Sequence, residues 1–167
     1  MLTLAELNAS SHERFASALG WIFENSPWVA ERTWEHRPFA SVEALHSAMV
    51  REVRLASHEE QHALLTAHPD LGSRARMSNT SVGEQAGAGL DRLTPEEFEH
   101  LQDWNSRYRA KFGFNFILAV KGSTKHDIVR SLEERVQSTQ DAEFQEALRQ
   151  VYRIASFRLT DAISKEG

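Results

Sequence analysis

The sequence has no cysteine, no basic block and no long apolar run. The absence of cysteine excludes disulfide bonds, a thiolate nucleophile and cysteine-ligated zinc, and it is typical of proteins in a reducing compartment. The net charge of −5 gives nucleic-acid binding little electrostatic support, so we expect no nucleic-acid partner. No apolar stretch approaches the length that spans a bilayer, so we expect no membrane partner.

The two ends of the sequence carry no recognisable targeting signal. The start, MLTLAELNAS, has no basic region followed by an apolar run, so we expect no signal peptide. The end, SKEG, differs from the peroxisomal S-K-L signal. We therefore expect a cytoplasmic protein.

Helix signals run through the whole chain, and its 167 residues are enough for one domain with a core. Ser-x-x-Glu patterns at Ser10, Ser57 and Ser81 predict helix starts. The apolar run FGFNFILAVKG has no helical period, so it predicts a buried extended or irregular segment. We predict an all-α fold, with residues 1–167 forming a single compact domain of about eight helices. Other helices are expected over 27–34, 41–56, 94–112, 125–138 and 141–164.

The stretch from His58 to His62 reads H-E-E-Q-H, which matches the H-E-x-x-H pattern of zinc proteases. His68 falls where metzincins place a third zinc-binding histidine. Those enzymes need a glycine three residues before that histidine to turn the chain, and here the position is Leu65, which favours a continuing helix. A zinc-dependent hydrolase built on His58, His62 and His68 is therefore an alternative that we disfavour.

The run HPDLG, residues 68–72, has a chemical logic of its own. Pro69 ends the preceding helix and leaves His68 at its C-terminus, where the helix dipole favours the imidazolium form. Such a histidine suits a proton donor near neutral pH. The alternative interpretation is a surface histidine beside a turn.

Two other motifs carry polar groups that could meet a ligand. The run SVGEQAGAGL places a hydroxyl, a carboxylate and an amide in the first turn of a predicted helix, where free backbone N–H groups can bind anions or carbonyls. Arg158 sits among apolar residues, which suits a bidentate carboxylate or urea contact. A capping box and a salt bridge to a neighbouring helix are the respective structural alternatives.

Together these motifs resemble the 2-oxo-4-hydroxy-4-carboxy-5-ureidoimidazoline (OHCU) decarboxylases of urate breakdown. The resemblance implies an all-helical, cofactor-free and commonly dimeric enzyme that releases carbon dioxide from OHCU and yields (S)-allantoin. It further implies a pathway shared with urate oxidase and hydroxyisourate hydrolase. The matching runs, in chain order, are RPFASVEAL (37–45), HPDLG (68–72), SVGEQAGAGLDRL (81–93), KFGFNFILA (111–119) and RIASFRLTD (153–161).

The resemblance also implies roles for individual residues. His68 matches the catalytic proton donor, Glu84 its partner carboxylate, and Arg158 the arginine that holds the substrate. No metal ligand is implied. The substrate-binding positions that it implies are Pro69, Ser81, Val82, Gly83, Gln85, Phe116, Ile117, Leu118, Ala119 and Val120.

Two features depart from the family pattern. Asn115 stands where the family commonly has proline, so we expect a different local backbone. The loop over residues 72–80 looks short, which would alter the rim of the pocket. Besides the zinc hydrolase, two alternatives stay open: a family paralogue that acts on a related ureide or imidazolone, and a helical interaction module without activity.

Overall fold

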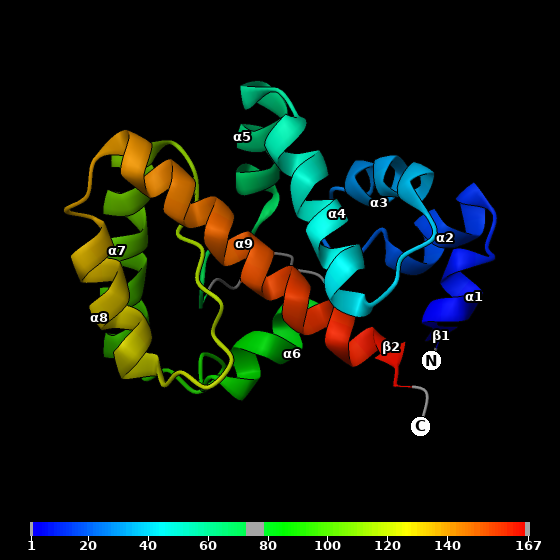
Figure 1. Cartoon of the computed structure of the whole chain (residues 1–167). Coiled ribbons are helices and arrows are strands. Elements are labelled where there is room, and N and C mark those ends of the chain that lie inside the picture. The colour runs from blue at the N-terminus through cyan, green and yellow to red at the C-terminus, as the bar shows by residue number, and fades with distance from the viewer. Residues whose placement is uncertain (1, 73–78, 166–167) are drawn as a thin grey trace. The chain divides into compact units, whose positions relative to one another are not determined.

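The structure is a computed structural model that describes residues 2–72 and 79–165. Nine α-helices, one 3-10 helix and one pair of two-residue strands lie in these ranges, so the all-α prediction is confirmed (Figure 1). The chain forms two compact units. Unit 1 comprises Met1–Ala67 with Tyr152–Gly167, and unit 2 comprises His68–Val151. The expectation that the whole chain is a single domain stays a prediction.

Unit 1 is built on helices whose starts are set by local capping. Ser41 accepts a hydrogen bond from the backbone N–H of Ala44 and begins α4 as predicted. Ser57 and Glu60 form the predicted capping box at the start of α5. The elements of unit 1 are β1 (Leu2–Thr3), α1 (Leu4–Asn8), α2 (His12–Leu19), α3 (Trp28–Thr33), η1 (Trp34–His36), α4 (Val42–Leu55), α5 (His58–Ala67), the C-terminal part of α9 (Gln140–Ala162) and β2 (Ile163–Ser164).

The predicted helix start at Ser10 is wrong by one residue. Ser11 is the N-cap of α2 and accepts from the N–H of Arg14, whereas the Ser10 hydroxyl donates to the carbonyl of Leu7. The reason is the short helix α1, which was not predicted from the sequence. The Ser10 hydroxyl bonds to a carbonyl in the last turn of this helix and so does not cap α2. Two adjacent serines therefore serve two different helices.

Unit 2 contains α6 (Asn79–Gly87), α7 (Pro95–Phe112), α8 (Lys125–Arg135) and the N-terminal part of α9. Thr94 and Glu97 form a capping box that begins α7, and Gly113, with φ +82°, ends it in the left-handed conformation. α7 and α8 lie side by side (Figure 1).

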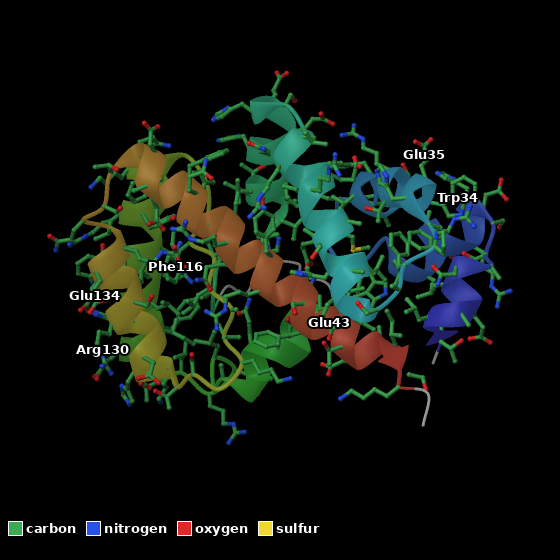
Figure 2. The ribbon with its side chains drawn as sticks, viewed as in Figure 1. Trp34, Glu35, Glu43, Phe116, Arg130 and Glu134 are labelled. Carbon is green, nitrogen blue, oxygen red and sulfur yellow. The ribbon has the colours of Figure 1, made fainter. Side chains whose placement is uncertain are left out.

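Residues 115–120 of unit 2 form neither helix nor strand, as predicted for this apolar run. Phe116 from this segment points inward, whereas Arg130 and Glu134 of α8 point outward (Figure 2). The ring of Tyr108 contacts three phenylalanine rings around it. The aromatic core of unit 2 thus fixes the segment next to α7, and its rings are Tyr108, Phe112, Phe114, Phe116 and Phe144.

The helix expected over 141–164 is present as α9, and the six apolar residues that recur along it at helical spacing are all buried. These six residues are Phe144, Leu148, Val151, Ile154, Ala155 and Leu159.

No helix within 2–72 and 79–165 is both long and apolar enough to cross a membrane.

The start of α6 differs from the prediction, since the helix begins at Asn79, two residues before Ser81. Ser81 therefore lies inside the first turn instead of capping it. Asn, Thr and Ser all favour caps and first turns, so the sequence could not decide which of them opens the helix. The side chain of Ser81 and residues 73–78, which include most of the loop noted as short, lie outside the described part of the chain.

Candidate active site

His68 is the first residue after α5, where the helix was predicted to end before Pro69. Its side chain is buried, with the residue 5% exposed. Pro69 and Asp70 are half-buried. The interpretation of His68 as a surface histidine beside a turn is therefore wrong, and a buried imidazole next to a helix end is a chemically plausible proton donor.

Hydrogen bonds in unit 2 bring two distant motifs to HPDLG. Oε1 of Gln85, on α6, accepts from the backbone N–H of Gly72 at 2.9 Å. Nδ2 of Asn115 donates to the backbone carbonyl of His68 at 2.7 Å. The runs at 68–72, 81–85 and 115–120 are therefore neighbours in space, as expected for parts of one site.

Gly72 closes the HPDLG run in a conformation that only glycine fits. Its φ is +71°, and a Cβ at this position would lie 2.4 Å from Cδ2 of Leu101 and 3.2 Å from Cδ1 of Leu93. Asp70 adds an ion pair with Arg109 of α7. The Asp70 side chain thus ties the run to α7 through this ion pair, and the glycine at position 72 lets the backbone approach Leu101 of α7 closely.

The residues of α6 differ in what they can offer to a ligand. Gln85 is buried and Glu84 is half-buried, whereas Val82 and Gly83 are exposed. Apart from the adjacent residues and the nearby backbone of α6 itself, no described atom would lie within 4 Å of a Cβ placed on Gly83 or on Gly87 one turn later. The side of α6 that carries these glycines is therefore open within the described structure.

The stretch from Phe116 to Val120 is buried apart from Leu118, which is half-buried. Two of its backbone groups already have protein partners. The carbonyl of Ile117 accepts from Nη1 of Arg135 at 2.6 Å, and the N–H of Ala119 donates to Oε1 of Gln150 at 3.0 Å. A substrate contact at these positions would therefore use other groups of the segment or the second lone pair of the Ile117 carbonyl.

Arg135 belongs to a buried ionic network beneath this stretch. Its Nε donates to Oε1 of Glu143 at 2.6 Å, and the hydroxyl of Tyr108 donates to the same oxygen at 2.6 Å. Burial, and then the hydrogen bond to the Glu143 carboxylate, raise the pKa of Tyr108 well above its ordinary value. Tyr108 therefore stays a neutral donor at physiological pH.

Arg158 lies in unit 1, on α9, and is 4% exposed. Its Nη2 forms a salt bridge of 3.0 Å with Oε2 of Glu24, and its Nη1 donates to the carbonyls of Ile22 at 3.2 Å and Trp21 at 3.4 Å. The salt-bridge alternative is present, although Glu24 belongs to the loop between α2 and α3 and not to a helix. A guanidinium has five N–H donors, which lets one arginine serve several partners at once.

The H-E-x-x-H residues lie on α5, where His58 is exposed and His62 is half-buried. α5 continues through Leu65 to Ala67, as expected without the metzincin glycine. Across the described ranges, no three His, Cys, Asp or Glu side chains gather as a set that could hold a metal ion. The arrangement therefore gives the zinc alternative no geometric support.

Sequence reasoning missed Asn105, which is fully buried and donates from Nδ2 to the carbonyl of Leu71 at 2.9 Å. The signal was available, because Asn105 interrupts the apolar stripe of α7 between Leu101 and Tyr108. A polar residue on a buried stripe needs a hydrogen-bond partner. The sequence did not identify that partner, which lies 34 residues away in HPDLG.

Comparison with known proteins finds similar proteins over nearly the whole chain. The family model described as OHCU decarboxylase matches residues 8–160. The chain is 48% identical to the 2-oxo-4-hydroxy-4-carboxy-5-ureidoimidazoline decarboxylase of Halalkalicoccus jeotgali over 160 residues, which cover 96% of this chain and 91% of that protein.

Two longer proteins contain a region similar to this chain. The uric acid degradation bifunctional protein PucL of Bacillus subtilis is 46% identical over 167 residues, and the match covers 100% of this chain and 34% of that protein. The crystal structure of (S)-allantoin synthase superposes with a TM-score of 0.80 at 35% identity, and the match covers 97% of this chain and 54% of that one. This chain thus spans about a third of the first protein and about half of the second.

Proposed function

Because the chain belongs to the OHCU decarboxylase family, we propose that it decarboxylates 2-oxo-4-hydroxy-4-carboxy-5-ureidoimidazoline to (S)-allantoin in urate degradation. The observation that carries this proposal is the 48% identity to a named decarboxylase over 96% of the chain. The burial of His68 and the hydrogen bonds from two other motifs to HPDLG support it from the structure.

The chemistry follows from the substrate. Its carboxylate leaves as carbon dioxide when the bond to the ring carbon breaks, and the electron pair that remains on this carbon is delocalised into the ring. In the proposed mechanism, this pair forms a double bond to the neighbouring ring carbon, which carries the ureido group, and the carbon that lost the carboxylate becomes the ring carbonyl as its hydroxyl loses a proton. His68 donates a proton to the ureido-bearing carbon from one face. One fixed acid gives one stereoisomer, which accounts for the (S) product. The ring serves as the electron sink, so the proposal needs no cofactor and no metal.

The other residues are proposed to orient the reactants. Glu84 would orient His68 or bind the substrate hydroxyl, and Arg158 would hold the substrate in addition to its salt bridge with Glu24. The helix start around Ser81 would bind a polar edge of the ring through its N–H groups. The further proposed substrate contacts are Pro69, Val82, Gly83, Gln85, Phe116, Ile117, Leu118, Ala119 and Val120.

The test is to supply fresh substrate by mixing the protein with urate, urate oxidase and hydroxyisourate hydrolase. Circular dichroism then follows the rate and hand of allantoin formation. We expect His68→Ala and Glu84→Ala to fold and to lose about 10²- to 10⁴-fold in rate, the usual contribution of general acid catalysis. Full activity of His68→Ala would remove this residue from the mechanism.

The same assay separates the alternatives. A His58→Ala, His62→Ala double variant is expected to stay active and to resist a chelator, whereas loss of activity in either test would restore the zinc hydrolase. No acceleration of (S)-allantoin formation by the folded wild type would favour a paralogue with a related ureide as substrate, or an interaction module.

We further propose that the chain acts as one domain in a cytoplasmic homodimer, in a pathway with urate oxidase and hydroxyisourate hydrolase. The family resemblance supports the dimer. Light scattering coupled to size-exclusion chromatography tests it, and a mass near 19.0 kDa would mean a monomer.

A further inference from the structure

The His68–Gly72 segment lies outside helices and strands, so its backbone groups need partners from elsewhere in the fold. Three side-chain amides supply them. We define Gln85, Asn105 and Asn115 as the amide clamp, because they bind the N–H of Gly72, the carbonyl of Leu71 and the carbonyl of His68, respectively.

The clamp reaches the segment from three separate elements. Gln85 lies on α6, Asn105 on α7, and Asn115 in the irregular segment that follows α7. Gln85 is 6% exposed and Asn105 is fully buried. Removing a partner from a buried polar group leaves that group unsatisfied, so the clamp favours one backbone path through HPDLG.

Asn115 makes the contact closest to the proposed proton donor. Its Nδ2 lies 2.7 Å from the carbonyl oxygen of His68, and this carbonyl is bonded to the Cα that carries the imidazole. Proline at position 115 could not make this bond, because it has no side-chain donor. Displacing a catalytic group by about 1 Å can reduce the rate by about 100-fold.

We propose that Asn115 is a positioning residue for His68, and that Asn105 supports it from the other end of HPDLG. This inference rests on the proposed role of His68 in decarboxylation. Asn115 touches the histidine backbone and acts on the reaction through the place of the imidazole.

Asn8 offers a matched control in unit 1. Its Nδ2 donates to the carbonyl of Phe39 at 3.0 Å, and, like Asn115, it is half-buried. Replacing either asparagine with leucine removes an amide donor from a backbone carbonyl and leaves a side chain of similar size. The Asn8 change also removes the Oδ1 that accepts from the N–H of Phe39 at 2.8 Å, so it is the more severe of the two for local hydrogen bonding. Both changes should lower the melting temperature, but only Asn115→Leu should affect His68.

The kinetic test measures kcat and KM in the coupled assay at a temperature where each variant is folded. We expect Asn115→Leu to lose about tenfold to a hundredfold in kcat with KM nearly unchanged. Asn115→Gln keeps an amide donor on a longer arm and should recover part of that loss. Asn8→Leu should keep the kcat of the wild type. Equal kcat values in Asn115→Leu and Asn8→Leu would overturn the inference.

A spectroscopic test does not depend on turnover. Protein labelled with ¹⁵N-histidine gives imidazole signals, and the His68 signal is the one that disappears in His68→Gln. It should shift in Asn115→Leu and stay in place in Asn8→Leu, and an unmoved signal in Asn115→Leu would overturn the inference. If Asn115→Leu does not fold, Asn115→Gln is judged by the same two measurements. Wild-type protein without decarboxylase activity would refute the proposed function, whereas the His68 signal would still decide whether Asn115 positions this residue.

Discussion

Each of the two units buries an arginine–glutamate pair. Helix α9 supplies one residue of each pair, a cation in unit 1 and an anion in unit 2. In unit 1, α9 supplies the cation, Arg158, which pairs with Glu24; these side chains are 4% and 1% exposed. In unit 2, α9 supplies the anion, Glu143, which pairs with Arg135 from α8; these side chains are 2% and 12% exposed. The two pairs have nearly the same chemistry and burial.

The pairs differ in the proposed role of their arginines. Arg135 binds the carbonyl of Ile117 and thus supports a backbone segment, whereas Arg158 is also proposed to hold substrate. Burial with a carboxylate partner is therefore no sign of catalysis by itself, because a structural arginine has the same surroundings. Only variants that separate stability from activity distinguish the two roles.

The largest expected effect follows from removing the arginine of either pair. Arg135→Met and Arg158→Met each leave a buried carboxylate without its cation, which costs about 3–5 kcal/mol in the free energy of unfolding. Urea unfolding measures this loss. We expect similar losses from the two variants, because the carboxylates are almost equally buried.

Activity should separate the same two variants. Arg158→Met is expected to lose its kcat, whereas Arg135→Met should keep a larger part of it, when both are assayed in conditions where they are folded. Equal losses of activity would indicate that Arg158 matters only through its salt bridge with Glu24. Both arginine–glutamate pairs would then have only a structural role.

A smaller effect is expected at Tyr108, which gives the pair of unit 2 a neutral donor in addition to Arg135. Tyr108→Phe removes the 2.6 Å hydrogen bond to Glu143 and should cost about 1.5–3 kcal/mol, the usual range for a hydrogen bond to a charged group. The melting temperature at pH 7 checks this. An unchanged value would mean that Arg135 alone satisfies the carboxylate.

Alkaline pH gives a second measurement on Tyr108. Its pKa is raised in the folded protein, first by burial and then by the Glu143 hydrogen bond. The stabilisation from this residue is therefore fully present below about pH 10, the ordinary tyrosine value, and is lost as the unfolded chain ionises above it. We expect the stability difference between wild type and Tyr108→Phe to shrink above about pH 10. A constant difference would contradict the raised pKa.

The sequence predicted features with local causes better than features that depend on distant partners. The caps at Ser41 and Thr94 were predictable, because the side chain and the N–H that it binds lie three residues apart. The start of α2 was misplaced because the Ser10 hydroxyl bonds to the end of α1. This helix is too short to show a helical period of apolar residues. The all-α class rests on many such local signals, so single errors did not change it.

The site was less predictable from the sequence for the same reason. His68 and Glu84 were found through motifs that resemble a family, but the sequence did not show what holds them. In the sequence, Asn115 was notable only because the family commonly has proline at this position. The His68 carbonyl to which it donates lies 47 residues away. The pair of Arg158 with Glu24 spans 134 residues. Such contacts depend on how the helices pack, and one sequence carries no direct signal of that packing.

The smallest expected effect comes from a partly exposed pair, Lys125 with Glu97, which tests how far burial accounts for the strength of the other two. Nζ of Lys125 lies 2.8 Å from Oε1 of Glu97, and both side chains are about 30% exposed. The Lys125 hydrogen bond, followed by the backbone N–H of Thr94, lowers the pKa of Glu97 from 4.5 to about 2. Solvent and salt screen such a pair, so its contribution to stability should be small.

Because the folded pKa of Glu97 is depressed, its contribution is present above about pH 4.5 and is lost as the pH falls toward 2. Glu97→Gln keeps an acceptor for the N–H of Thr94 and removes only the charge. The melting temperature of this variant should lie slightly below that of the wild type at pH 7, and the two should converge between pH 4.5 and 2. Glu99→Gln, an exposed change on the same helix, is the control and should show no such convergence. A Glu97 effect as large as that of Arg135→Met would mean that burial is not what makes the pairs of the two units strong.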